Sequence, residues 1–199
     1  MKTLKINSLK NLISLSFILV LFMSACSNAQ NSTKETEVNT KETETAIANI
    51  GVDINTAVVT GNLEAVKKHI AAGTNIDEKD QMTGSTPLIT PATFNKVDIV
   101  KVLIEAQADL SLKNNDGSTA LHSAAFFGRI EVVQMLIDAK ADKTIRNNFG
   151  ATPRESVLGD FNDMKPIYEM LKKQLTPFGF ELDMEELKKA RPVIAMMLQ

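Results

Sequence analysis

The sequence has little material for chemistry. Its 199 residues contain one cysteine, two histidines, one tyrosine and no tryptophan. A single cysteine excludes an internal disulfide framework and any zinc site built mainly from cysteine. His69 and His122 leave little for metal binding or general-base catalysis, because no carboxylate, serine or cysteine lies at a spacing that indicates a dyad. We therefore expect no enzyme activity, no metal and no cofactor.

An excess of charge of one sign is also absent. The chain has 22 Lys and Arg residues against 24 Asp and Glu residues, a formal net charge of −2. This balance predicts no basic surface for nucleic acid. Apolar residues make up 44% and charged residues 23%, as in ordinary globular proteins, and the length allows one domain with a tail.

Only one long apolar run is present, residues 12–25, and three lysines precede it. A helix of this length spans roughly 21 Å, short of the ~30 Å hydrocarbon core of a bilayer. The pattern therefore favours a signal peptide over a transmembrane helix. The run ends in Met-Ser-Ala-Cys at residues 23–26, which resembles the lipobox of bacterial lipoproteins.

That resemblance implies cleavage after residue 25 and a lipid on Cys26. The alternative is ordinary cleavage after Ala25 with an incidental thiol. Ser27 after the cysteine is similar to the pattern of outer-membrane sorting, so the expected location is the outer membrane, facing the periplasm or the cell surface. Membrane contact is expected only through this anchor.

Residues 26–46 are almost free of large apolar side chains, and the pentad Thr-Lys-Glu-Thr-Glu occurs twice, at 33–37 and 40–44. Such a segment cannot bury enough surface to offset its chain entropy. We predict a disordered tether with a reach of roughly 25 Å.

The main signal is a period of 33 residues. Glycines mark it at positions 51, 84, 117 and 150, and a threonine follows three of them at 86, 119 and 152. These threonines are N-cap candidates for a short first helix, which Gly128 ends in one unit. A second helix with apolar residues on one face follows in each unit, at 97–104 and 130–137. One unit cannot bury its own apolar face, so stacking must supply the core.

Residues 117–128, GSTALHSAAFFG, resemble the signature of the ankyrin repeat, Gly-x-Thr-Pro-Leu-His-x-Ala-Ala-x-x-Gly. The resemblance implies an all-α ankyrin-repeat solenoid over residues 47–175, with about four repeats of which the outer two are atypical caps. In the second repeat Pro91 falls inside the first helix, which we expect to be short or distorted. In the fourth repeat the segment beginning at Met164 is expected to form the second helix. Residues 176–199 are expected to form a C-terminal helical extension that Pro192 kinks or divides.

The same resemblance assigns roles to individual residues. His122 occupies the position at which the family's imidazole bonds a neighbouring turn, whereas His69 is expected to face solvent. Partner contacts are implied at the turn tips and on the surface of the first helices. The corresponding positions are Met82, Thr83, Thr90, Thr93, Phe94, Asn115, Asp116, Ser123, Phe126, Phe127, Arg129, Asn148 and Phe149. For Phe94 and Phe126, packing between repeats as core remains an equal alternative.

The function expected from these features is noncatalytic binding of a protein partner by a monomeric, lipid-anchored module of the bacterial cell envelope. Two specific versions are an immunity protein against a delivered toxin and a helper in oxidative-stress defence. The alternative from another class is a small-ligand-binding or enzyme-accessory lipoprotein, which would need an apolar pocket.

Overall fold

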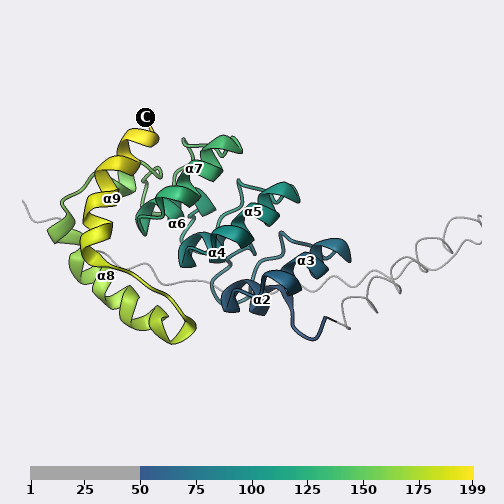
Figure 1. Ribbon diagram of the computed structural model, residues 1–199. Coiled ribbons are helices and arrows are strands. Elements are labelled where there is room, and N and C mark those ends of the chain that lie inside the picture. Colours follow the sequence, from purple (N-terminus) through teal and green to yellow (C-terminus); the bar gives the residue numbers. More distant parts are fainter. Residues whose placement is uncertain (1–49) are drawn as a thin grey trace, which may run out of the picture.

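The computed structural model describes residues 50–199. These residues form helices and loops and contain no strand, which confirms the predicted all-α fold (Figure 1). In chain order the helices are α2 (Ile54–Thr60), α3 (Leu63–Ala71), α4 (Ile89–Phe94), α5 (Val97–Glu105), α6 (Ala120–Phe126), α7 (Ile130–Asp138), the 3-10 turn η1 (Glu155–Val157), α8 (Phe161–Leu175), the 3-10 turn η2 (Thr176–Phe178) and α9 (Met184–Met197).

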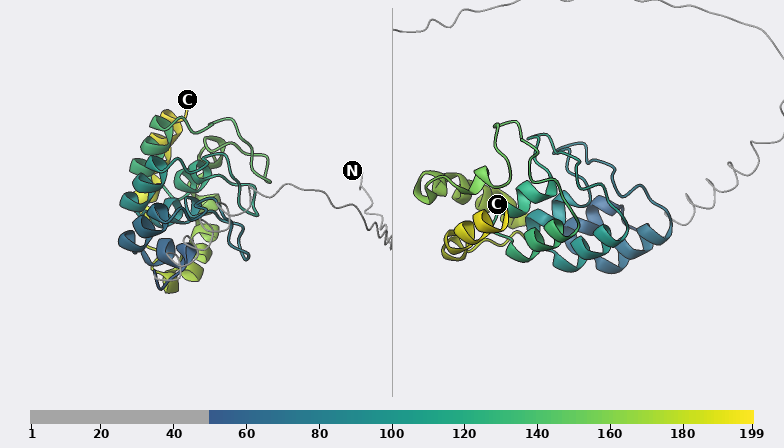
Figure 2. Two further views of the ribbon diagram at one scale, coloured as in Figure 1. Left: turned by 90° about the vertical axis from the view of Figure 1, so that its right-hand side faces the viewer. Right: turned by 90° about the horizontal axis from the view of Figure 1, so that it is seen from above.

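The helices stack in two rows. The first helices α2, α4 and α6 follow one another in one row, and the second helices α3, α5 and α7 follow in the other (Figure 1). Each first helix also packs on the second helix of its own repeat. The loops between repeats extend to one side of both rows as a series of fingers (Figure 2). The expected solenoid is therefore present.

Threonine hydroxyls bond the backbone where the first half of three repeats begins. The hydroxyl oxygens of Thr86, Thr119 and Thr152 each accept a hydrogen bond from the backbone N–H three residues on, at 3.2–3.4 Å. Gly128 follows the C-cap of α6 with a φ of 73°, a conformation that costs a glycine little. Thr119 is the N-cap of α6, as predicted. The N-caps of α4 and η1 are Leu88 and Arg154, so Thr86 and Thr152 bond the first residue of each element without being its N-cap.

Pro91 leaves α4 helical but short. The helix spans six residues, against seven in α6, and its first residue is Ile89 rather than the residue after the threonine. Pro91 is the third residue of α4, where its missing N–H would have had no partner within the helix. The expected shortening is therefore confirmed.

The core repeats with the same period as the sequence. Ile99, Val100 and Leu103 on α5 are buried, and Val132, Val133 and Leu136 occupy the equivalent places on α7. Alanines of the first helices, including Ala92 and Ala124, are fully buried where neighbouring rows approach closely. The apolar faces of the repeats thus merge into one core.

The fourth layer differs from the expectation. Its first half is only η1, which packs on α6. Its second half is α9, which packs on α7 and on η1, so α9 continues the row of second helices. The segment beginning at Met164, expected in that place, belongs instead to α8. Residues 158–183, which we call the insert, therefore lie in the chain between the two halves of the last layer.

Pro192 does not divide the last helix. A single helix, α9, runs from Met184 to Met197 with Pro192 inside it. Ile194, Ala195 and Leu198 join the core of the repeats, as expected for this segment. Within residues 50–199, no helix combines the length and hydrophobicity needed to cross a bilayer.

Candidate functional site

Three fingers carry their tips in a line along one side of the molecule (Figure 2). The tips of the first, second and third finger are residues 80–84, 114–117 and 147–150. Equivalent positions in the three tips are 33 residues apart. Two side chains at the two ends of the line stand out in solvent: Met82 is 88% exposed and Phe149 is 79% exposed. Between them, Asn115 and Asp116 are also exposed. A flat or extended partner surface could contact the whole line.

Hydrogen bonds join each finger to the next by the same pattern. The Asn115 N–H donates to the carbonyl oxygen of Thr83 at 2.9 Å, and its side-chain amide donates to the carbonyl oxygen of Met82 at 3.1 Å. One period later the Asn148 N–H donates to the carbonyl oxygen of Asp116 at 2.9 Å. The Asn148 side-chain amide donates to the carbonyl oxygen of Asn115, also at 2.9 Å.

These bonds form a ladder along the fingers and give five of the predicted contact residues a structural role. The residues that hold the fingers together through their backbones or amides are Met82, Thr83, Asn115, Asp116 and Asn148, so only their remaining atoms are available to a partner. Gly84 and Gly117 are buried under the asparagine of the following finger. The ladder therefore makes the line of tips a rigid unit.

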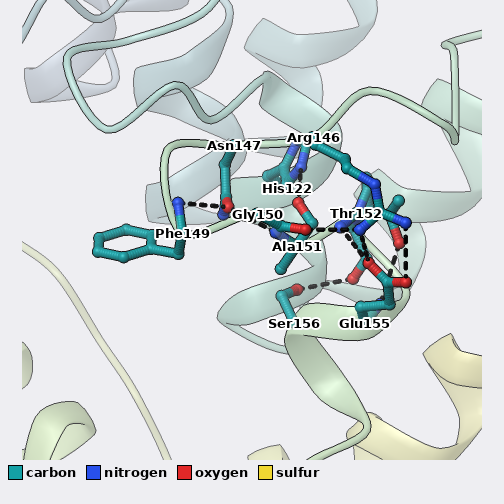
Figure 3. Close-up of polar contacts among 10 residues, drawn as sticks. His122, Arg146, Asn147, Phe149, Gly150, Ala151, Thr152, Glu155 and Ser156 are labelled. Atoms are coloured by element: carbon teal, nitrogen blue, oxygen red, sulfur yellow. Dashed lines mark hydrogen bonds and ion pairs between the residues drawn. The ribbon is translucent and has the colours of Figure 1, made fainter.

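His122 fixes the base of the third finger. The Thr119 N–H donates to Nδ1 of His122 at 3.2 Å, so the proton lies on Nε2, which donates to the carbonyl oxygen of Ala151 at 3.1 Å (Figure 3). Burial lowers the pKa of His122 below its usual value of 6.5, and the cation of Lys113 lowers it further, although the bond to Ala151 acts in the opposite direction. His122 is thus a neutral structural link, as the resemblance implied.

An ion pair stiffens the same finger on its other side. Arg146 bonds the carboxylate of Glu155 and the carbonyl oxygen of Gly150, and Glu155 in turn accepts from the Thr152 N–H (Figure 3). The bond from Arg146 is the largest cause that lowers the pKa of Glu155, to about 2. The pair is therefore charged throughout the physiological range.

The expectation that His69 faces solvent is wrong. Its side chain is 1% exposed; Nε2 lies 2.8 Å from the carbonyl oxygen of Val52 and Nδ1 lies 3.0 Å from the hydroxyl of Thr74. His69 shares the buried face of α3 with Ala65 and Val66. It therefore joins the chain entering the first repeat to the end of α3.

The first-helix surface is covered by the insert. Phe180 is 2% exposed, and its ring meets Phe94 and Phe127 edge to face at centroid distances of 5.5 and 5.1 Å. Tyr168 of α8 is fully buried with its ring 4.7 Å from that of Phe126. Three aromatic side chains predicted for a partner, Phe94, Phe126 and Phe127, are instead in contact with the insert.

Several predicted contact residues therefore need correction. Phe127 and Ser123 are each 8% exposed, so neither is available on the surface. Phe94 and Phe126 are partly buried against the insert, neither exposed to a partner nor wedged only between repeats. The physical reason is that aromatic side chains of the first helices and of the insert cover one another and are removed from water together.

Arg129 belongs to the same contact. Its Nε donates to the carbonyl oxygen of Thr93 at 3.2 Å, and an Nη donates to the carbonyl oxygen of Glu181 at 2.6 Å. The guanidinium also lies 5.2 Å from the ring centroid of Phe180. Burial lowers the pKa of Arg129 to about 10, so it remains a cation and fastens the insert to the repeats. Thr90 is partly buried on α4, as is Thr93.

A second arginine, Arg191 of α9, bonds the first half of the insert. Arg191 of α9 is 3% exposed and donates to the hydroxyl of Tyr168 at 2.5 Å and to the carbonyl oxygen of Gly159 at 2.6 Å. Four residues of this contact were not identified from the sequence: Tyr168, Phe180 and Leu182 of the aromatic cluster, and Arg191, which holds Tyr168. The only local sign was the alternation of Phe178, Phe180 and Leu182 with polar or small residues, which is too short to place them.

Residues 50–199 show no metal-binding cluster, and the predicted lipidation site lies outside them. Among residues 50–199, no group of three His, Cys, Asp or Glu side chains lies close enough to hold a metal ion. Every buried side-chain nitrogen and oxygen in that part has a hydrogen-bond partner. Cys26 and the predicted tether lie outside the described residues.

Comparison with known proteins identifies the repeats. The family model described as "Ankyrin repeats (3 copies)" matches residues 54–147. Among solved structures, the ankyrin repeat domain of Bcl-3, described as a unique member of the IkappaB protein family, is 32% identical, with a TM-score of 0.49. The match covers 50% of this chain and 44% of that one, so the chain spans less than half of that domain. No curated protein matches the sequence.

Proposed function

We propose that this chain, whose residues 54–147 are ankyrin repeats, is a noncatalytic protein-binding module that a lipid on Cys26 holds at the bacterial cell envelope. The partner binds along the line of finger tips between Met82 and Phe149. The fold supports the coarser part of this proposal, since ankyrin repeats form a scaffold for protein–protein interaction. We infer the anchor from residues 12–27 and the binding surface from the exposed side chains of the finger tips.

The exposure of two large apolar side chains at the tips carries the proposal. Met82 and Phe149 are the two most exposed large apolar residues of the described part. Keeping such side chains in water has no benefit for the fold, whereas aromatic residues and methionine are enriched in protein interfaces. Because the ladder holds the tips rigidly, a partner would lose little conformational freedom of this chain on binding.

The covered first-helix surface supports the same choice. Phe127 and Phe180 bury one another, so a partner on that face would first have to displace the insert. The finger tips need no such rearrangement. Of the residues predicted for partner contact, the proposal therefore keeps those at the tips: Met82, Thr83, Asn115, Asp116, Asn148 and Phe149.

The proposed location depends on the sequence alone. The apolar run at 12–25, the lipobox-like residues 23–26 and Ser27 favour an anchor in the outer membrane, facing the periplasm or the surface. A delivered toxin and an enzyme of oxidative-stress defence are both partners that such a module could bind. The identity of the partner decides between these two roles.

Partner binding can be tested by quantitative affinity capture from solubilised envelopes. The Phe149→Ser and Met82→Ser variants should each retain less of the captured partner, because one apolar contact is removed, while their unfolding midpoints stay close to that of the unmodified chain. Met196→Ser is the matched control, since Met196 is 62% exposed on α9, outside the finger tips. Equal capture by all four proteins would remove the finger tips from the proposal.

The anchor is tested separately by metabolic labelling with palmitate. The unmodified chain should incorporate the label and fractionate with membranes. The Cys26→Ala variant should do neither, because the acylated sulfur is gone. Label that persists in the variant would exclude Cys26 as the lipidation site.

A further inference from the structure

The third finger has no further finger bonded to its outer side in the described residues. The hydrogen bonds between one finger and the next are called a step of the ladder. In each of the first two steps, two carbonyl oxygens of one finger accept the backbone N–H and the side-chain amide of the next asparagine. The equivalent carbonyl oxygens of the third finger belong to Asn148 and Phe149. Neither accepts a hydrogen bond from any residue in the range 50–199.

The glycines show that the space for a further asparagine is also empty. A Cβ built on Gly84 would lie 2.3 Å from Oδ1 of Asn115, and one built on Gly117 would lie 2.5 Å from Oδ1 of Asn148. Each of these glycines therefore leaves room for the amide of the next finger. A Cβ on Gly150 would meet no described atom within 4 Å. Gly150 is exposed, whereas Gly84 and Gly117 are buried.

The third finger alone has an aromatic side chain before its glycine. Thr83 and Asp116 occupy the position before the glycine in the first two fingers, and Phe149 occupies it in the third. Its ring points away from the other labelled residues of the finger, into open space (Figure 3). The backbone around it is held by His122, Arg146 and Glu155. The open step thus combines fixed acceptors with an exposed aromatic ring.

We propose that the third finger is a docking edge for a turn that carries an asparagine, presented by a different protein. This rests on the proposed function and names the chemistry of the partner. The asparagine donates its N–H to the Phe149 carbonyl oxygen and its side-chain amide to the Asn148 carbonyl oxygen, over Gly150. An apolar residue beside it packs on the ring of Phe149.

A second copy of this chain does not fit the edge. Asn115 and Asn148 are engaged in their own ladder. The first finger has Met82 where an asparagine would be needed, and the Met82 N–H already donates to the carboxylate of Asp80 at 2.9 Å. None of the three fingers of a second copy can therefore supply the donors, and the occupant that we propose is a turn of another polypeptide.

The test uses a cyclised peptide with the sequence of residues 113–118, Lys-Asn-Asn-Asp-Gly-Ser, as the probe. This is the chain's own second finger, which docks on the first finger in the same way. Titrated into the isotopically labelled full chain, the peptide should shift the amide resonances of Phe149, Gly150 and Ala151. Replacing its second asparagine with aspartate should weaken binding by about tenfold, because an amide donor becomes an acceptor.

Two glycine variants serve as a matched pair. Gly150→Ala should abolish the shifts by filling the space for the incoming amide. Gly51→Ala should keep them, since Gly51 also has a positive φ, of 83°, and nothing within 4 Å of its Cβ. Absence of shifts at millimolar peptide, or shifts that survive Gly150→Ala or the aspartate peptide, would overturn this inference.

The proposed function has an independent test. If Phe149→Ser reduces partner capture but the peptide produces no shifts, the finger tips bind a partner by another chemistry and only the docking edge is wrong. If the peptide binds but capture is unchanged in the serine variants, the edge exists and the binding surface named in the proposed function is wrong.

Discussion

At the scale of single residues, the repeats are joined by a few polar side chains whose protonation is set by burial. His122 is 2% exposed and accepts at Nδ1 while donating from Nε2, which requires the neutral ring. Protonation would place a second N–H at Nδ1, facing the Thr119 N–H. The neutral form therefore belongs to the folded state.

This geometry predicts a dependence of stability on pH. Burial depresses the pKa of His122 in the folded state below 6.5, so the unfolded chain binds a proton more readily. Stability should be constant above about pH 7 and fall as the pH drops below 6.5, by at most about 1.4 kcal/mol per pH unit. Urea unfolding at pH 7.5 and pH 5.5 measures this change.

The His122→Gln variant is the control for that experiment. It removes the titrating group, so the loss of stability between the two pH values should become smaller. An unchanged or larger loss in the variant would assign the pH dependence to other groups.

The cap at Thr119 was predictable because its partner, the N–H of His122, lies three residues on in the same repeat. The role of His122 came from the family resemblance, since its partner, the carbonyl oxygen of Ala151, lies in the next repeat. His69 was not predictable in this way. Its partner, the carbonyl oxygen of Val52, is 17 residues away and belongs to the entry segment of an atypical repeat. A local pattern of polar and apolar residues contains no information about such a contact.

At the scale of helices, the last layer was assigned to the wrong segment. Ile167, Met170 and Leu171 on α8 have the spacing of a second helix, and Ile194 with Ala190 and Leu198 on α9 has it as well. Which helix packs on α7 depends on close approach in space. Gly128 provides that approach, since a Cβ there would lie 2.8 Å from Leu187 and 3.3 Å from Ala190. Two candidates for one place cannot be separated by periodicity.

The contact of the insert with the repeats predicts different effects for two phenylalanines in one segment. Phe180→Ala should destabilise the closed insert by about 3 kcal/mol, because a buried ring leaves a cavity among Phe94, Phe127 and Leu187. Trypsin cleavage after the exposed Lys172 and Lys173 should become faster.

Phe178→Ala is the matched control for cleavage. Phe178 is 59% exposed, so its removal should change the cleavage rate little. Equal acceleration in both variants would indicate that the aromatic cluster does not hold the insert closed.

At the scale of the whole molecule, stability depends on the completion of the last layer. Ile194 is fully buried in the core that runs through the repeats, whereas the neighbouring Val193 is 38% exposed. Ile194→Ala should lower the free energy of unfolding by about 2–4 kcal/mol. Val193→Ala should lower it by less than about 1 kcal/mol.

Chemical denaturation followed by far-UV circular dichroism measures both variants. The unfolding of all repeats should shift together in Ile194→Ala, since neighbouring repeats stabilise one another. A transition that moves only in fluorescence of Tyr168, with the helical signal unchanged, would show that α9 does not support the repeats.

The order of the chain through the last layer has a consequence for synthesis on the ribosome. Residues 155–157 emerge about thirty residues before residues 184–197, the helix with which they share a layer. The earlier repeats can assemble in the order in which they are synthesised. The face of α7 that packs on α9 stays exposed to solvent until α9 has been synthesised. We therefore expect the last layer and the contacts of the insert with Arg191 to form together, in one late step after the synthesis of α9.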